Sequence, residues 1–305
     1  MTNYFSNLTR YGLPQSIVHY LPVTDHDERW GIVCTTAGYQ NVPPGSPYPL
    51  TQHPDSYSFT RSRGRVLGEY QLLYIVSGQG EFRSASSPAA PVKAGTVVML
   101  FPDEWHTYAP DPETGWEEWW VGFRGENIDR RVAEGFFSPK TPLLHIGHSA
   151  GIVSCYQEII RSAEEERKGF QQLVTGIVLH LLGSVLFKRD NLQYLDNPIV
   201  EKINRAREMM RRHIGDNLPP EEIARRLNIG YTWFRRTFRA YVGIAPAQYQ
   251  LQLRHNKARE LLTTTDRTVS EIAAELGFEN VSQFSAFFRQ REKITATQYR
   301  SKYGF

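Results

Sequence analysis

The pattern of apolar and polar positions changes character along the chain. Residues 1–140 contain short alternating runs, such as Tyr70–Val76 and Thr96–Phe101, bounded by glycine turns such as Ser77–Gly80. Alternation with a period of two is typical of strands that bury one face. Many short strands of this kind predict an antiparallel barrel or sandwich. Because several prolines between Pro43 and Pro54 interrupt any helical period, we expect no helices in this region.

Residues 150–190 switch to a helical period. Apolar residues recur there at spacings of three and four, namely Leu173, Val174, Ile177, Val178, Leu181, Leu182, Val185 and Leu186. Such a wide apolar stripe is typical of a helix with one buried face, and a second helix over 152–167 precedes it. The stripe packs either across a dimer interface or against the barrel of the same chain. Residues 190–198 are interpreted as a linker that ends at a helix start, Pro198.

The last hundred residues are helical in pattern and contain an internal repeat. Residues 223–229, Ile-Ala-Arg-Arg-Leu-Asn-Ile, correspond to residues 272–278, Ile-Ala-Ala-Glu-Leu-Gly-Phe, at an offset of 49. Further along, Phe234 corresponds to Phe284 at an offset of 50, so the second copy has one additional residue between these positions. A repeat of this kind indicates two copies of one structural unit.

Each copy has the pattern of a helix-turn-helix unit. In the first copy, Pro219–Glu222 places proline and acidic residues at a helix start, and Asn228–Gly230 provides a short turn. Phe234 and Phe238 are four residues apart, so they share the buried face of the second helix. The opposite, exposed face carries Thr232, Arg235, Arg236 and Arg239 in the first copy, and Ser282, Gln283, Ser285 and Arg289 in the second.

These exposed faces carry side chains suited to DNA. Arginine reads guanine or binds phosphate, glutamine reads adenine, and serine and threonine make weaker contacts. The charge distribution supports this interpretation. Residues Glu201–Phe305 hold 19 Lys and Arg against 11 Asp and Glu, which gives this segment a net charge of +8. Residues 1–200 carry a net charge of −5, so the positive charge is concentrated in the segment with the repeat. The segment Pro246–Leu262 predicts one long helix that would hold the two units about one turn of DNA apart. We therefore expect double-stranded DNA as a partner.

This C-terminal segment resembles the DNA-binding domain of the AraC-type transcription regulators. The resemblance is carried by Ile223-Ala224, Phe238 with Gly243, Pro246 with Tyr249, Arg254 with Ala258-Arg259 and Leu261-Leu262, Ile272-Ala273 with Gly277-Phe278, Phe284 with Phe288-Arg289, and Tyr299-Arg300. Lys293, Ala296 and Ala286 depart from the usual pattern of the family. The resemblance implies that the protein is a homodimeric transcription activator that contacts RNA polymerase. It also implies that the protein is not an enzyme.

The N-terminal strands resemble the cupin-like sensor domain of the same family. The resemblance is carried by Tyr70–Phe82, Lys93–Tyr108 and Trp116–Phe123. It implies a pocket for a small polar effector, a carbohydrate, whose matching residues are Arg65, His106, Tyr108 and Trp120. Glu118 lies two residues before Trp120 and therefore on the same strand face.

The chemistry of these five residues suits a sugar, because an indole stacks on the apolar ring face while Arg, Glu and His bond the hydroxyl groups. Core packing of Trp120, a structural role for His106, and Arg61 or Arg63 in place of Arg65 remain open alternatives. The segment with Tyr39, Tyr48 and Tyr57 is expected to fold over the pocket. No cofactor is expected.

Several other classes of function find little support. Cys34 and Cys155 are too few for a disulfide framework, and we expect both to be reduced. His106 has no second ligand two residues on, and His145 and His148 lack further partners, so we expect no metal site. No run approaches about 18 apolar residues and no secretory signal precedes the strands, which indicates a cytoplasmic protein without a membrane span.

One rival motif is Gly147-His148-Ser149-Ala150-Gly151, which matches the G-x-S-x-G nucleophile elbow of α/β-hydrolases. An elbow requires a parallel sheet and a downstream acid and histidine on further strands, whereas the sequence after Gly151 is helical. We therefore expect Ser149 to cap the following helix. A hydrolase and a ligand-independent DNA-binding protein remain the alternatives.

The sequence thus predicts an α+β chain with three parts. Residues 1–145 form a cupin-like jelly-roll β-barrel that senses a ligand. Residues 146–192 form a helical hairpin for dimerisation or packing. Residues 193–305 form an all-α DNA-binding domain with two helix-turn-helix units.

Overall fold

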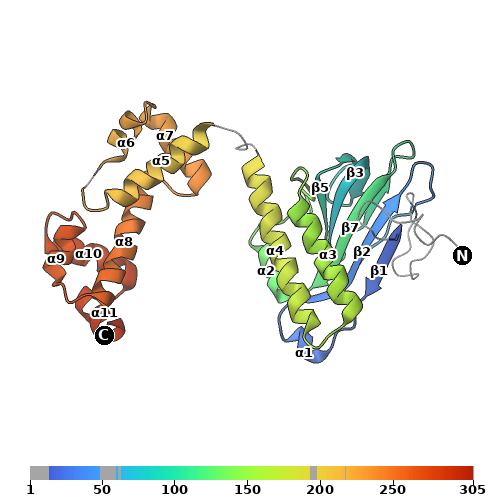
Figure 1. Ribbon diagram of the computed structural model, residues 1–305, viewed down its shortest axis with the longest axis horizontal. Coiled ribbons are helices and arrows are strands. Elements are labelled where there is room, and N and C mark those ends of the chain that lie inside the picture. Colours follow the sequence, from blue (N-terminus) through green and yellow to red (C-terminus); the bar gives the residue numbers. More distant parts are fainter. Residues whose placement is uncertain (1–13, 49–59, 61–62, 193–197, 217, 305) are drawn as a thin grey trace, which may run out of the picture. The chain divides into compact units, whose positions relative to one another are not determined.

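The computed structural model describes residues 14–48, 60, 63–192, 198–216 and 218–304. The chain divides into two compact units, residues 1–193 and 194–305. The first combines a sheet with helices and the second is helical, so the predicted α+β class is confirmed (Figure 1). Residues 193–197 of the expected linker lie outside the described residues.

Eight strands build the sheet of the first unit, in the order β1-β2-β7-β3-β5-β8, with β4 and β6 both pairing with β3. The long strand β3 pairs with β5 and β7 through its first half and with β4 and β6 through its second half. Every pairing between these strands is antiparallel, as predicted. The strands are β1 (Ser16–Tyr20), β2 (Val33–Val42), β3 (Tyr70–Ser84), β4 (Ala90–Lys93), β5 (Thr96–Leu100), β6 (His106–Pro110), β7 (Trp116–Arg124) and β8 (Leu143–His145).

The sheet buries side chains on both faces, because successive residues of a strand point to opposite sides. On β3, Leu72 and Tyr74 point to the face that is covered by the helices α3 (Ala150–Glu165) and α4 (Phe170–Asn191) (Figure 1). Leu73 and Ile75 point to the other face, which we call the inner face. The apolar side chains of the inner face also include Val42, Phe82, Val98, Tyr108, Trp116 and Trp120.

The apolar stripe of α4 is divided between a buried and an exposed side. Val174, Val178 and Val185 are completely buried in the core that also contains Trp119 of β7. Burial of a side chain of this size stabilises the fold by about 1.5–3 kcal/mol relative to exposure. This half of the stripe therefore packs within the chain. On the other side of the helix, Leu173 is 54% exposed.

α4 is also, among the described helices, the one that is long and apolar enough to cross a membrane by length and composition alone. Its most apolar window has a mean hydropathy of 1.6 and is 39% buried inside the first unit. Its buried side chains pack with α3 against the sheet. The core of the first unit therefore accounts for much of its apolar character.

Two short helices lie among the strands, where none was expected: α1 (Asp25–Glu28) and α2 (Glu126–Ala133). α1 begins with a capping box, in which the Thr24 side chain accepts from the Asp27 amide and the Asp27 carboxylate accepts from the Thr24 amide. The expectation was wrong because it rested on the prolines of positions 43–54, and both helices lie outside that segment.

The second unit contains α5 (Pro198–Arg212), α6 (Pro220–Arg226), α7 (Tyr231–Val242), α8 (Pro246–Thr264), α9 (Val269–Glu275), α10 (Val281–Glu292) and α11 (Ala296–Tyr303). The two predicted helix-turn-helix units are α6–α7 and α9–α10. Their first helices are offset by 49 residues and their second helices by 50, so the additional residue lies in the second turn. Asn228 occupies a left-handed conformation, with φ of 53°, in the first turn, and Gly277 does so, with φ of 71°, in the second.

Each unit of the repeat has its own apolar core. Phe234 and Phe238 of α7 are completely buried, and so are Phe284 and Phe288 of α10. α8 contributes to both cores, because Tyr249 and Leu253 near its start pack in the first while Ala258, Leu261 and Leu262 near its end pack in the second. The predicted connecting helix therefore links the two cores directly.

Candidate ligand pocket and DNA-binding surface

Arg65 and His106 are joined through both backbone and side chains. The Arg65 amide donates to the His106 carbonyl at 2.9 Å, and the His106 amide donates to the Arg65 carbonyl at 3.0 Å. The Nδ1–H of His106 donates to the Glu104 carbonyl at 3.0 Å, which leaves Nε2 to accept from Arg65 Nε at 3.3 Å. Burial and the nearby guanidinium lower the pKa of His106 to about 4, so the ring is neutral at pH 7. His106 thus uses both ring nitrogens to orient Arg65.

The guanidinium group of Arg65 contacts the inner face through further neutral acceptors. Its Nη2 donates to the hydroxyl of Tyr108 at 2.7 Å and to Oε1 of Gln71 at 3.5 Å. Gln71 in turn donates to the buried carboxylate of Glu69 at 2.8 Å. A polar network therefore runs from the loop before β3 onto the inner face.

Glu118 places a buried carboxyl group on the inner face, where it is 3% exposed. Its Oε1 accepts from the Tyr48 hydroxyl at 3.1 Å, whereas its buried Oε2 has no hydrogen-bond partner among the described residues. Burial raises the pKa of Glu118 to about 7, against the smaller opposing effects of the Tyr48 hydrogen bond and of Arg65. Trp116, two residues earlier on the same strand, likewise has a buried Nε1 without a partner in the described part of the chain.

Two tryptophans of the inner face lie against glycines of neighbouring strands. A Cβ on Gly38 of β2 would collide with the indole of Trp120, and a Cβ on Gly80 of β3 would lie 2.7 Å from Cζ3 of Trp116. Both glycines are therefore needed where these rings approach the backbone. Trp120 is 8% exposed and Trp116 is 2% exposed.

The five residues expected at the pocket are thus brought together with three others. We call this group the inner-face cluster: Tyr48, Arg65, Gln71, His106, Tyr108, Trp116, Glu118 and Trp120. The sequence interpretation missed Tyr48 as a hydrogen-bond partner, Gln71 and Trp116. Trp116 could have been found, because it precedes Glu118 by two residues and therefore shares its strand face.

The expectation that Tyr39 folds over the pocket is wrong. Tyr39 lies on the helix-covered face of β2, where it packs at 4.4 Å from the ring of Trp119 and donates to the carboxylate of Glu117. Tyr48 does reach the inner-face cluster, and Tyr57 lies outside the described residues.

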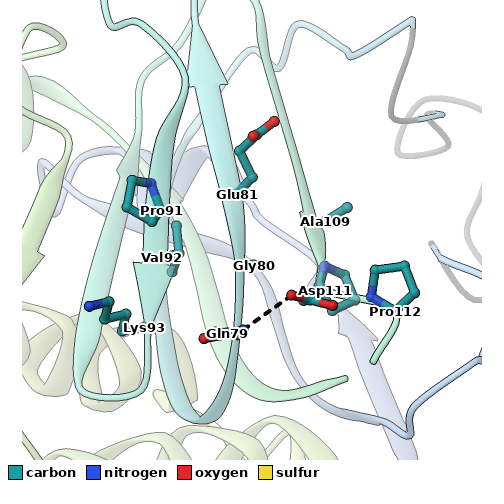
Figure 2. Close-up of a pocket in the computed structure, with 10 residues that line it drawn as sticks. Gln79, Gly80, Glu81, Pro91, Val92, Lys93, Ala109, Asp111 and Pro112 are labelled. Atoms are coloured by element: carbon teal, nitrogen blue, oxygen red, sulfur yellow. Dashed lines mark hydrogen bonds between the residues drawn. The ribbon is translucent and has the colours of Figure 1, made fainter. Parts of the chain in front are cut away.

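A separate surface hollow of about 340 Å³ lies across β3, β4 and β6 (Figure 2). The side chains of Gln79, Glu81, Lys93 and Asp111 line it, and Gln79 donates to Asp111 at 3.1 Å. None of the five expected pocket residues lines this hollow.

The predicted DNA-facing side of α7 is exposed over all four positions, Thr232, Arg235, Arg236 and Arg239. Within the described residues, none of these three arginines forms a side-chain ion pair or hydrogen bond. The arginines of α6 differ, because Arg225 and Arg226 both pair with Glu222 and lower its pKa to about 2. α7 therefore presents uncompensated positive charge. The sequence interpretation missed Trp233, which is 37% exposed beside these arginines.

The corresponding side of α10 is less basic. Ser282, Gln283 and Arg289 are exposed, and Ser285 is half-buried. The Gln283 side chain accepts from the Glu279 amide at 3.0 Å, and the Gln283 backbone amide donates to the Asn280 side chain at 2.8 Å. Both hydrogen bonds cap the start of α10, so the Gln283 side chain is already engaged there. Arg289 is the one cation among the four predicted positions.

Comparison with known proteins agrees with both halves of this arrangement. Residues 44–182 match the AraC-like ligand binding domain, and residues 223–302 match a helix-turn-helix domain. The chain belongs to the AraC-type family of transcription regulators. This AraC-type regulator therefore binds DNA and carries a ligand-binding domain, as the sequence resemblance implied.

Two relatives match most of the regulator. The Msm operon regulatory protein of Streptococcus mutans is 22% identical over 240 residues, which cover 78% of this chain and 86% of the relative. The raffinose operon transcriptional regulatory protein RafR of Pediococcus pentosaceus is 22% identical over 259 residues, which cover 81% of this chain and 90% of the relative. The solved structure of a transcriptional regulator from Chromobacterium violaceum, described as one of the AraC-type DNA-binding domain-containing proteins, is 29% identical, and the match covers 35% of this chain and 96% of that chain with a TM-score of 0.33.

As a member of this family the regulator is not an enzyme. The hydrolase alternative also lacks its structural setting, because β8, which precedes the G-x-S-x-G motif, pairs antiparallel with β5. Ser149 instead caps α3, where its hydroxyl accepts from the Ile152 amide at 3.4 Å. The described residues contain no group of three or more His, Cys, Asp or Glu side chains arranged to hold a metal ion.

Proposed function

We propose that this AraC-type regulator is a sequence-specific transcription activator whose DNA binding is controlled by a sugar bound at the inner-face cluster. One observation carries the sugar assignment: Glu118 Oε2 and Trp116 Nε1 are buried side by side on β7 without hydrogen-bond partners in the described part of the chain. A buried acceptor and a buried donor without partners each cost free energy, so both favour a ligand that satisfies them. A sugar hydroxyl can serve either, because it donates and accepts.

The surroundings of Glu118 support a ring-shaped polar ligand. Trp120, two residues along β7, contributes a large apolar surface, and Arg65 contributes charged donors near the same carboxyl group. Pockets that combine apolar walls with a few fixed polar groups are typical of small-molecule sites. The name of one relative refers to a raffinose operon, which also favours a saccharide for this chain.

Binding measurements on the full chain test the sugar assignment. We expect at least one of raffinose, lactose and arabinose to bind in isothermal titration, and Trp120→Leu to weaken that binding about tenfold or more, or about 1.4 kcal/mol. Trp30→Leu is the matched control, because Trp30 is 57% exposed and belongs to neither core cluster of the sheet. Equal affinity in wild type and Trp120→Leu would contradict the assignment.

We propose that α7 supplies most of the base recognition and that α10 makes a weaker second contact. The three unpaired arginines of α7 and the engaged Gln283 of α10 support this ranking. α8 packs in both helix-turn-helix cores and thereby fixes their separation, which suits contacts in successive major grooves. A regulator that reads DNA acts where the genome lies, which in bacteria is the cytoplasm.

We propose that the exposed side of α4 pairs with the same side of a second copy. Leu173 and Phe187, 54% and 68% exposed, lie seven residues to either side of the exposed His180. In an antiparallel pair of helices centred on His180, Leu173 of each copy would meet Phe187 of the other. Lys188 would then approach the acidic end of α3, residues 164–166, which adds charge complementarity.

Sedimentation equilibrium of the full chain tests this pairing. We expect a dimer for the wild type and a shift toward monomer for Phe187→Glu, because a charged side chain would be buried in the contact. Phe136→Glu is the matched control, since Phe136 is similarly exposed, at 54%, and lies away from α4 in the sequence. A wild-type monomer at all concentrations would contradict the pairing.

Activation requires productive contact with RNA polymerase and has its own test. In transcription reactions with purified polymerase and a promoter that carries a selected binding site, we expect the regulator to increase transcript yield when sugar is present. Repression, or an effect that is independent of sugar, would support a repressor or the ligand-independent alternative instead.

A further inference from the structure

We propose that Glu118 makes the inner-face cluster selective for uncharged sugars and excludes sugar phosphates and sugar acids. This inference deepens the proposed function and rests on it. It concerns one residue, Glu118, and one property of the ligand, its charge.

Among the described residues, the inner face holds more carboxyl groups than cations. Glu69 and Glu118 are 6% and 3% exposed, and both carboxyl groups lie in the polar network described above. Within the described part of the chain, Arg65 is the cation of this network, because His106 is neutral. The other titratable groups that face Glu118 are the hydroxyls of Tyr48 and Tyr108, and burial raises the pKa of each. With both carboxyl groups ionised, the described groups Glu69, Glu118 and Arg65 sum to a charge of −1, and protonation of Glu118 removes one negative charge from this sum.

The positive charge of Arg65 does not make the site favourable for an anionic ligand. Its donors already bond the Tyr108 hydroxyl, Gln71 Oε1 and His106 Nε2 at 2.7–3.5 Å. These bonds occupy Nε and Nη2, so a phosphate that approached these two nitrogens would have to displace them. It would also bring a second negative charge close to Glu118, whose titration already responds to Arg65. Like charges in a buried site repel strongly, because the surroundings screen them poorly.

A neutral sugar meets no such obstacle. Its hydroxyl can donate to Glu118 Oε2, the oxygen without a partner in the described residues, and form a charge-assisted hydrogen bond. The Nε1–H of Trp116, on the same face of β7, can donate to a second hydroxyl. Both unsatisfied groups are then paired without adding charge to the pocket.

Replacement of Glu118 by Gln tests the role of its charge. Glutamine keeps the shape of the side chain and one of its two oxygens, replaces the other by an NH2 group that can donate to a sugar hydroxyl, and removes the negative charge. Glu117→Gln is the matched control: Glu117 is the adjacent residue, is also buried, at 4%, and points to the helix-covered face, where it accepts from Tyr39 and Ser77. Its charge is expected to have little influence on a ligand at the inner face.

The experiment is isothermal titration of the full chain at pH 8, where Glu118 is mostly ionised. The probes are raffinose, arabinose, and matched pairs of neutral and charged sugars: lactose with lactose 6-phosphate, galactose with galactose 6-phosphate, and galactose with galacturonate. We expect wild type and Glu117→Gln to prefer the neutral member of a pair by about tenfold or more, and Glu118→Gln to reduce that preference to about threefold or less.

The outcomes separate this inference from the function on which it rests. If a neutral sugar binds and its charged partner binds wild type equally well or better, the inference is overturned while the sugar pocket stands. The inference also falls if Glu118→Gln, folded by circular dichroism, keeps the full preference of the wild type. If no neutral probe binds, the proposed sugar pocket is contradicted and the inference with it. If Glu118→Gln does not fold, equal or tighter binding of the charged member by the wild type still overturns the inference.

Discussion

Gly38 of β2 and Trp120 of β7 are register partners in the antiparallel sheet, and the indole of Trp120 lies so close to Gly38 that no Cβ fits between them. The position of the largest apolar side chain expected at the pocket therefore depends on the absence of a side chain across the strand pair. This pairing connects the backbone of β2 directly to the ligand-binding chemistry of the inner face.

Gly38→Ala should displace Trp120 and loosen the pocket. We expect a loss of about 1–3 kcal/mol in the free energy of unfolding, because the added methyl group overpacks a filled site. Tryptophan fluorescence during urea unfolding measures this loss, since five of the six tryptophans lie in the first unit. Gly68→Ala is the control, because a Cβ there meets no atom within 4 Å. Equal destabilisation by both variants would contradict the described contact.

Glu118 should make the stability of the first unit depend on pH. Its folded pKa of about 7 lies above the usual value of 4.5, so the protonated form is favoured in the folded state. The contribution of this group is therefore fully present below pH 4.5 and is lost as the pH rises through 7. Relative to Glu118→Gln, the wild type should lose about 3 kcal/mol of stability between pH 4.5 and 8.

Urea unfolding of both proteins at several pH values checks this prediction. The difference in unfolding free energy between wild type and Glu118→Gln is the quantity to follow, because it cancels the titration of groups that the two proteins share. A difference that stays constant from pH 4.5 to 8 would show that Glu118 has an ordinary pKa.

Arg235→Ala and Arg236→Ala should weaken binding to a DNA site selected by the wild-type regulator. We expect a cost of about 1–3 kcal/mol and relaxed base choice for an arginine that contacts a base edge. A uniform loss over all sequences, with the salt dependence reduced by about one counterion, identifies a phosphate contact instead. Arg225→Ala is the control, because Arg225 pairs with Glu222 on α6. If the control loses as much affinity as the α7 variants, α7 has no special role.

Gln283→Ala should cost less DNA affinity than either substitution on α7. The Gln283 side chain accepts from the Glu279 amide at the start of α10, so base contact would require that bond to break. Fluorescence anisotropy with the same selected DNA provides the comparison. A loss for Gln283→Ala that equals or exceeds that for Arg235→Ala would reverse the proposed ranking of the two helices.

The sequence predicted the second unit well because its signals are local. Phe234 and Phe238, four residues apart, define a helix face without reference to any distant residue, and their counterparts Phe284 and Phe288 repeat the signal. Ser149 was likewise recognisable as a helix cap from its immediate neighbours. Period-two alternation also predicted Glu118 and Trp120 on one face of β7, where Trp120 packs in the inner-face core and Glu118 bonds Tyr48 beside it.

Contacts between distant strands were harder to predict. Nothing near Tyr39 indicates which face of β2 it occupies, since a shift of one residue exchanges the two faces of a strand and β2 contains an irregularity between Cys34 and Thr36. The role of His106 depends on Arg65, which is 41 residues away in sequence. The stripe of α4 could not be assigned to one partner because the helix has apolar side chains on both sides.

The central claim is that a sugar at the inner-face cluster changes the affinity of the regulator for DNA. The most direct test is fluorescence anisotropy of a labelled, selected DNA site with the full chain, titrated with raffinose, lactose and arabinose. We predict that at least one sugar shifts the midpoint of DNA binding about tenfold in the wild type, or about 1.4 kcal/mol, and that Trp120→Leu abolishes the shift. Identical DNA affinity with and without every sugar, or a shift that survives in Trp120→Leu, would contradict the account.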